Sequence, residues 1–275
     1  MATLRIPDVV PSPDEDSETL VKSFKGLGTN EKSVISVLGH RNASQRKKIR
    51  ETYQQLYNKS LIDDINSELS GDFRKAVILW TYEPSERDAR LANEALLQVI
   101  VEIACASSPD HLVAVRQAYC GLFNRSLEED IIQKILIGLV RSYRYDRELV
   151  DPSTANEEAA ILREAIFLFI LSTRNGYQLR ATFECYKQNY GFSIDQLESI
   201  LKVVIWCIES PEKHFAEVVR ASIVGFGTDE DSLTRAIVTR AEVDMMKVRG
   251  EYNKTSLVID DTSGDYRKFL MTLLG

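Results

Sequence analysis

Hydrophobic positions recur at steps of three and four residues along most of the chain. In one early stretch they are Val34, Val37, Leu38, Ile49, Tyr53 and Leu56. This spacing gathers apolar side chains on one face of an α-helix, and the strict alternation typical of β-strands is nowhere sustained. The pattern therefore predicts an all-α protein built from short amphipathic helices.

The helical pattern returns four times along the chain. Three copies share an arginine that precedes a tyrosine by twelve residues. The pairs are Arg41 and Tyr53, Arg174 and Tyr186, and Arg240 and Tyr252. The second copy in chain order runs from Ile103 to Tyr119, with Ser107 in place of the arginine. Because one copy is too small to bury its own apolar face, the copies are expected to pack on one another.

These copies divide the chain into an N-terminal segment and four repeats. We predict the segment at residues 1–15 and the repeats at 16–84, 85–150, 151–213 and 214–275. Their internal spacings differ, and we interpret the differences as loop residues missing from the chain as given, with the numbering closed over them. The predicted junctions are Leu96/Leu97, Ile132/Gln133, Ile166/Phe167, Gln196/Leu197, Tyr252/Asn253 and Leu257/Val258.

Composition and charge narrow the class of protein. The 275 residues are 44% hydrophobic and 27% charged, which is typical of soluble globular proteins. The net charge of −7 repels nucleic acid, and it also repels anionic lipid unless a cation bridges the two. No apolar run reaches the roughly 18 to 20 residues of a membrane span, and residues 1–11 do not read as a signal peptide. We therefore predict a cytosolic protein without a nucleic-acid partner.

Two further side-chain patterns have structural interpretations. The basic run at residues 46–48 is interpreted as the solvated face of a helix. The cysteines form no C-x-x-C pair, so the sequence indicates neither a zinc site nor a disulfide framework, and we expect them to be reduced in the core. These cysteines are Cys105, Cys120, Cys185 and Cys207.

Two glycine-containing loops are the candidate functional sites. Residues 25–29 read K-G-L-G-T, and residues 224–228 read V-G-F-G-T. Glycines let the backbone turn so that carbonyl oxygens converge, and calcium prefers six to eight oxygen ligands that often include a carboxylate. Glu68 lies forty residues after Gly28, and Asp261 lies 34 after the matching glycine of the second loop. Residues missing around 253–257 would restore the spacing of forty, so we predict two calcium loops.

The G-x-G-T loops, the distant acid before a Gly-Asp-aromatic-basic run and the four copies together resemble the annexin family. The resemblance covers residues 16–275, and residues 1–4 and 142–146 are similar to plant members. It implies about five short helices in each repeat, packed as a curved disc. It also implies a calcium ion held by loop carbonyls and the distant carboxylate. The implied ligands are Phe24, Gly26, Gly28 and Glu68 in the first repeat, and Ile223, Gly225, Gly227 and Asp261 in the fourth, with Glu31 and Glu230 as weaker accessory ligands.

The function that this resemblance implies is calcium-dependent binding to acidic phospholipid membranes, without enzymatic activity. Calcium would bridge the first and fourth loops to lipid phosphates, and the tips Leu27 and Phe226 would dip into the membrane interface. The protein would be cytoplasmic and become peripheral to membranes when calcium rises. Actin and self-association are further partners that the resemblance suggests. The second and third copies show no such loop.

Alternative functions stay open at this point. His40 stands where some plant annexins have a histidine linked to peroxidase activity, although one histidine does not make a haem pocket. Residues 261–264 read D-T-S-G, a fragment also found in nucleotide-hydrolysing proteins, but no P-loop accompanies it. Glu102 and Arg235 match an ion pair of the annexin channel, which would favour a calcium-modulated ion channel or a pair that only stabilises the fold.

Overall fold

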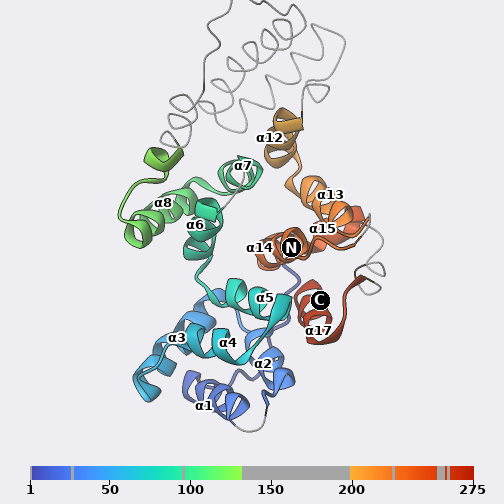
Figure 1. The fold of residues 1–275 in the computed structure, drawn as a ribbon. Coiled ribbons are helices and arrows are strands. Elements are labelled where there is room, and N and C mark those ends of the chain that lie inside the picture. Colours follow the sequence, from blue (N-terminus) through green and yellow to red (C-terminus); the bar gives the residue numbers. More distant parts are fainter. Residues whose placement is uncertain are drawn as a thin grey trace, which may run out of the picture. The chain divides into compact units, whose positions relative to one another are not determined.

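The computed structural model describes residues 2–25, 28–94, 97–131, 199–224, 227–252, 258 and 261–275. Throughout these ranges the regular elements are helices, which confirms the all-α prediction (Figure 1). None of these helices is long and apolar enough to cross a bilayer. The chain forms two compact units, Met1–Asp88 with Glu212–Gly275, and Ala89–Pro211.

The first unit joins the two ends of the chain. Its helices are α1 (Pro13–Phe24), α2 (Glu31–Leu38), α3 (Ala43–Tyr57), α4 (Leu61–Glu68), α5 (Gly71–Thr81), α13 (Pro211–Ile223), α14 (Glu230–Arg240), α15 (Met245–Tyr252) and α17 (Gly264–Leu274), and α6 (Pro84–Glu94) begins in it. Helix α5 lies at its centre, where it contacts α2 and α4 as well as α14 and α17. Figure 1 shows the last helix, α17, beside α5. The first and fourth copies therefore pack on each other, as the small size of one copy requires.

The core of the first unit follows the predicted helical faces. Trp80 of α5 is fully buried and donates its indole N–H to the carbonyl oxygen of Leu38 at 2.7 Å. Phe73 of α5 meets Phe269 of α17 edge to face, with ring centroids 5.9 Å apart. The predicted apolar face is wrong at Leu56, whose side chain is 51% exposed on α3. The other apolar positions named from the periodicity are buried: Val34, Val37, Leu38, Ile49 and Tyr53.

The basic run at the start of α3 is only partly solvated. Lys47 and Lys48 are exposed as predicted, but Arg46 is 1% exposed, so the prediction is wrong for that residue. Its guanidinium stacks 3.6 Å from the ring centroid of Trp80 and donates to a carboxylate oxygen of Glu242 at 2.9 Å. Adjacent helical residues point in different directions, so one member of a basic run can face the core while the next two face water.

The two ends of the chain are bonded together. The backbone N–H of Thr3 donates to the carbonyl oxygen of Ala241, and its hydroxyl donates to that of Leu273 at 2.6 Å. The guanidinium of Arg249 donates to the last carbonyl oxygens, those of Leu274 and Gly275. Because Thr3 itself is buried, the N-terminal segment is part of the folded first unit.

Gly39 follows α2 at a close approach to α17. A Cβ atom there would lie 2.6 Å from the carbonyl oxygen of Ile35 and 2.9 Å from Cγ2 of Thr272. We expect Gly39→Ala to lower the free energy of unfolding by about 1 to 3 kcal/mol, since both neighbours must shift. Urea unfolding measures the change. The matched control is Gly250→Ala in α15, where nothing lies within 4 Å of the added methyl, and equal stability of the two variants would contradict the prediction.

His214 in α13 is buried beside Phe215. Burial, and then the nearby charge of Arg240, lower the pKa of His214 from 6.5 to about 4. Between these values the unfolded chain binds a proton that the folded protein does not. Stability should therefore be complete above pH 6.5 and fall as the pH drops towards 4, by at most about 3 kcal/mol from this residue. Unfolding midpoints at several pH values, compared with those of His214→Gln, measure the effect, and an unchanged pH slope in the variant would contradict it.

The second unit has a smaller apolar core. Helices α7 (Leu97–Ala106) and α12 (Ser199–Glu209) contact each other, and the unit also contains α8 (Pro109–Phe123) and most of α6. The buried cluster is formed by Ala89, Ala92, Ile103, Val115 and Tyr119. The described cysteines form no disulfide, and they differ in burial: Cys207 is buried, Cys105 is half-buried and Cys120 is exposed. The prediction of core cysteines is therefore wrong for Cys120.

Candidate functional site

The first glycine loop, called loop 1 here (residues 25–30), connects α1 to α2. Gly28 has a φ of +97°, a left-handed conformation that favours glycine. The backbone N–H of Asn30 donates to the carbonyl oxygen of Ser23 at 2.9 Å, which closes the loop on the end of α1. The side chain of Asn30 then accepts from the backbone N–H of Ser33 and caps α2.

The second glycine loop, called loop 4 (residues 224–229), connects α13 to α14 in the same way. Gly227 has a φ of +93°. The backbone N–H of Asp229 donates to the carbonyl oxygen of Ser222 at 2.8 Å, and its side chain accepts from the N–H of Ser232 to cap α14. At their described residues, loops 1 and 4 therefore share a positive-φ glycine and one set of closing bonds.

A threonine ties each loop to its distant acid. The hydroxyl of Thr29 donates to the carbonyl oxygen of Glu68 at 3.0 Å and lies 3.4 Å from its carboxylate. The hydroxyl of Thr228 donates to the carbonyl oxygen of Asp261 at 3.2 Å. The acid is thus held beside the loop although more than thirty residues separate them in the sequence.

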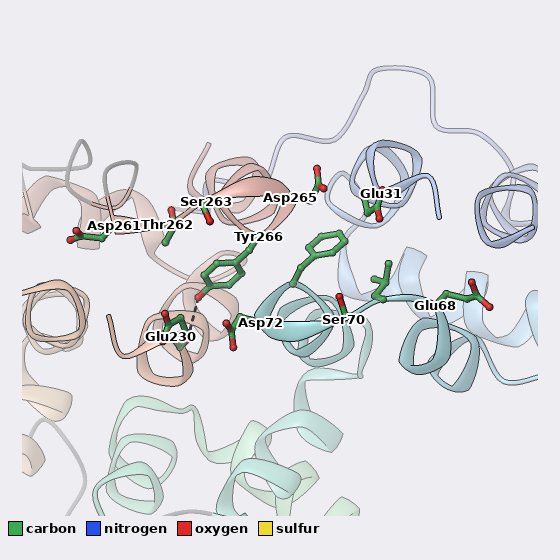
Figure 2. A pocket seen from close by; sticks show the side chains of 12 residues that line it. Glu31, Glu68, Ser70, Asp72, Glu230, Asp261, Thr262, Ser263, Asp265 and Tyr266 are labelled. Atoms are coloured by element: carbon green, nitrogen blue, oxygen red, sulfur yellow. Dashed lines mark hydrogen bonds between the residues drawn. The ribbon is translucent and has the colours of Figure 1, made fainter. Parts of the chain in front are cut away.

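Both acids line one polar cavity of about 310 Å³ inside the first unit. Figure 2 shows Glu68 and Asp261 at opposite sides of the view, with Asp72 and Tyr266 between them. The cavity is lined by Glu31, Glu68, Leu69, Ser70, Asp72, Phe73, Glu230, Asp261, Thr262, Ser263, Asp265 and Tyr266. Six of these residues are carboxylates, so the cavity is a region of negative potential that attracts cations.

The helices around the cavity are joined by an ion pair between the first and fourth copies and by a hydrogen bond within the fourth copy. The ammonium group of Lys75 on α5 donates to Asp231 on α14 at 2.8 Å and lies 3.5 Å from Asp72. The hydroxyl of Tyr266 bonds to the hydroxyl of Thr234 at 2.8 Å. Burial raises the pKa of Tyr266, so its phenol is neutral at physiological pH. These contacts keep the acidic helix ends of α5 and α17 side by side.

The structure tests where the predicted ligand residues lie. Phe24 and Ile223 are the last residues of α1 and α13, and Gly28 and Gly227 form the positive-φ turns. Glu68 ends α4 and is exposed, as is Asp261. The accessory candidates Glu31 and Glu230 are the first residues of α2 and α14. The remaining predicted residues, Gly26, Gly225, Leu27 and Phe226, lie outside the described residues.

The donor set of each loop fits calcium better than a softer metal. Within the described ranges no three His, Cys, Asp or Glu side chains cluster as metal ligands. A cation at loop 1 or loop 4 would therefore share one carboxylate with neutral oxygens of the backbone. An all-oxygen set of this kind suits a hard cation.

Sequence reasoning missed two features of this site. The first is the hydrogen bond from Thr29 and Thr228 to the acid, although the threonine of each G-x-G-T motif was visible. The second is the pair Asp72 and Asp265, which line the cavity beside the expected ligands. The S-G-D run that follows each distant acid could have indicated both aspartates from the sequence.

The residues behind the alternative functions lie elsewhere or have other contacts. His40 is half-buried and follows the C-terminal end of α2, whereas loop 1 precedes the N-terminal end of that helix. Its Nδ1 lies 3.2 Å from the carbonyl oxygen of Ser36. Asp261 of the D-T-S-G fragment belongs to the cavity of loop 4. Glu102 and Arg235 are both buried, but they belong to different units, and their pairing stays a prediction.

Comparisons with known proteins place the chain in a family. The annexin family model matches residues 15–80 and 214–273, which correspond to the predicted first and fourth copies. Annexin D3 of Arabidopsis thaliana is 54% identical over 318 positions, covering 100% of this chain and 99% of the relative. Annexin-like protein RJ4 of Fragaria ananassa is 46% identical, covering 95% of each. With 275 residues in this chain, at least 43 of the 318 positions (318 minus 275) have no counterpart here, in keeping with the predicted missing loop residues.

Solved structures agree with this placement. Chicken annexin V is similar with a TM-score of 0.80 and 29% identity, covering 100% of this chain and 98% of that one. A structure of annexin III has a TM-score of 0.83 at 29% identity, with coverage of 100% and 97%. A calcium-bound annexin (Sm)1 has a TM-score of 0.77 at 27% identity, with coverage of 100% and 93%. With its plant relatives, its helical architecture and its paired glycine loops, the chain belongs to the annexin family.

Proposed function

We propose that this annexin binds acidic phospholipid membranes when calcium rises, as a non-enzymatic protein of the cytoplasm. Calcium bridges loop 1 with Glu68, and loop 4 with Asp261, to lipid phosphates. The observation that carries the proposal is the common geometry of the two loops, in which a threonine bonds each loop to its acid. Loops that served only to connect helices would rarely share both the same turn and the same distant acid.

Charge explains why calcium is needed. The net charge of −7 and the six carboxylates of the cavity repel an anionic membrane. One carboxylate and a few neutral oxygens leave a divalent charge partly uncompensated, and lipid phosphate can supply the missing negative ligand. Calcium and lipid should therefore each strengthen the binding of the other.

The proposed function includes several specific assignments. These are the repeat boundaries at 16–84, 85–150, 151–213 and 214–275, the eight predicted ligand residues, and the movement to membranes on calcium elevation. The insertion of loop tips into the interface is part of the same proposal. Actin and self-association stay predictions from the family resemblance.

Sedimentation with vesicles tests the proposal. The protein is mixed with phosphatidylserine vesicles in calcium or in chelator, with pure phosphatidylcholine vesicles as the lipid control. We expect pelleting only when calcium and phosphatidylserine are both present. Pelleting in chelator, or equal pelleting with both lipids, would overturn the role of calcium as a bridge.

The tie between threonine and acid gives a finer prediction. Thr29→Val removes the hydroxyl that holds the backbone of Glu68 to loop 1, while it keeps the size of the side chain. A lost hydrogen bond of about 1 kcal/mol corresponds to roughly a fivefold higher calcium requirement for vesicle binding. Thr19→Val is the matched control, because the hydroxyl of Thr19 bonds to its own helix at Glu15. Identical calcium requirements in both variants would show that the tie does not position the acid.

A further inference from the structure

Loops 1 and 4 share a positive-φ glycine and the same closing bonds, but they differ in chemistry at matching positions. Lys25 follows α1 at the start of loop 1, and Val224 follows α13 at the start of loop 4. Both residues are exposed. Val224 is 57% exposed, the largest value among the exposed large apolar side chains outside the N-terminal segment. An exposed apolar side chain beside a proposed membrane contact is placed where it could enter the interface.

The starts of the following helices differ in charge as well. Residues 30–32 read N-E-K, whereas residues 229–231 read D-E-D. Lys32 is exposed at the start of α2. Asp231, its counterpart on α14, has a side chain that is 76% exposed although it bonds to Lys75. Loop 1 thus presents two lysines beside its carboxylates, and loop 4 presents three successive acids together with the exposed Val224.

From this difference we infer that the two loops divide the contact with the membrane. Loop 1 holds anionic headgroups directly through Lys25 and Lys32. Loop 4 is repelled by the same headgroups until calcium neutralises its acids, and it then inserts Val224 into the interface. The inference rests on the proposed membrane function and adds a specific role to each loop.

Physical chemistry separates the two roles. Attraction of a lysine to an anionic surface is screened by salt and falls off within about 10 Å at 0.1 M ionic strength. Each lysine near such a surface contributes about fivefold in affinity. Insertion of an apolar side chain depends on buried area, so added salt does not weaken it. Salt dependence and insertion should therefore respond to different substitutions.

The experiment compares a lysine variant, Lys25→Ala with Lys32→Ala, and the apolar variant Val224→Ser. All proteins are tested at saturating calcium on phosphatidylcholine vesicles that contain phosphatidylserine, across a series of salt concentrations. Insertion is measured separately as the pressure increase in a phosphatidylserine monolayer. The matched controls are Lys47→Ala with Lys48→Ala at the start of α3, and Val243→Ser, a 55% exposed valine beyond the far end of α14 from loop 4.

We expect the lysine variant to lose on the order of tenfold in vesicle affinity at low salt, with a loss that shrinks as salt is added and an unchanged monolayer response. We expect Val224→Ser to reduce the monolayer response and to lose about threefold in affinity at every salt concentration. Equal effects of the two variants on both readouts, or variants that behave like their controls, would overturn the division of roles. If the wild type does not bind in calcium at all, the proposed function fails as well.

Discussion

Removal of both distant acids, Glu68→Ala with Asp261→Ala, should severely weaken calcium-dependent binding to phosphatidylserine vesicles. In the proposed sites each acid supplies the charged ligand, and its backbone carbonyl oxygen accepts from the loop threonine at 3.0 Å in loop 1 and 3.2 Å in loop 4. Without it, a cation would be left with neutral oxygens only, and calcium affinity depends strongly on ligand charge. We expect the calcium requirement to rise by on the order of a hundredfold in the double variant and tenfold in each single one. Vesicle sedimentation across a calcium series measures it.

The control removes the same amount of charge elsewhere. Glu51 and Glu251 are exposed on α3 and α15, outside loops 1 and 4. The variant Glu51→Ala with Glu251→Ala should need the same calcium as the wild type. If the double variant of Glu68 and Asp261 binds like this control, the calcium sites lie elsewhere and the assignment of both loops is wrong.

The second large effect is on stability, at the contact of α3 with the fourth copy. A carboxylate oxygen of Glu242 accepts from Arg46 at 2.9 Å, and the other accepts from the backbone N–H of Ala43 at 2.7 Å. Burial lowers the pKa of Arg46, and the charge of Glu242 opposes that shift. Glu242→Ala would leave a buried guanidinium without its counter-charge. We expect the free energy of unfolding to fall by about 3 kcal/mol, measured by urea unfolding.

A conservative variant separates charge from hydrogen bonding. Glu242→Gln keeps an acceptor for Arg46 or Ala43 and should cost roughly 1 kcal/mol. Replacement of both partners, Arg46→Met with Glu242→Leu, should recover part of the loss because no buried charge remains. A loss below about 0.5 kcal/mol in Glu242→Ala, the size of an ordinary surface change, would show that this pair does not stabilise the first unit.

Local structure could be predicted well from the sequence. The three- and four-residue spacing predicted the helices and buried positions such as Val34 and Ile49. The paired G-x-G-T motifs predicted two equivalent turns, because a positive φ is a local demand that glycine meets at Gly28 and Gly227. These features depend on residues close together in the chain, and sequence patterns report them directly.

Features that depend on distant residues could not be predicted in the same way. The acidic cavity joins residues near 70 with residues near 265, and it exists only because α5 packs on α14 and α17. The burial of Arg46 depends on the same packing, which provides Glu242 as its partner. Composition showed a basic run, but it did not show which member would meet a carboxylate from the other end of the chain.

If calcium joins the two loops to lipid phosphate, lipid must change the calcium-binding isotherm of the protein. Calcium binding to the full chain is measured by titration calorimetry with and without phosphatidylserine vesicles. We expect weak binding by the protein alone and much tighter binding with vesicles, an increase that the Glu68→Ala and Asp261→Ala double variant lacks. Calcium affinity that is the same with and without vesicles would contradict it, because a bridging ion must bind more tightly when both of its partners are present.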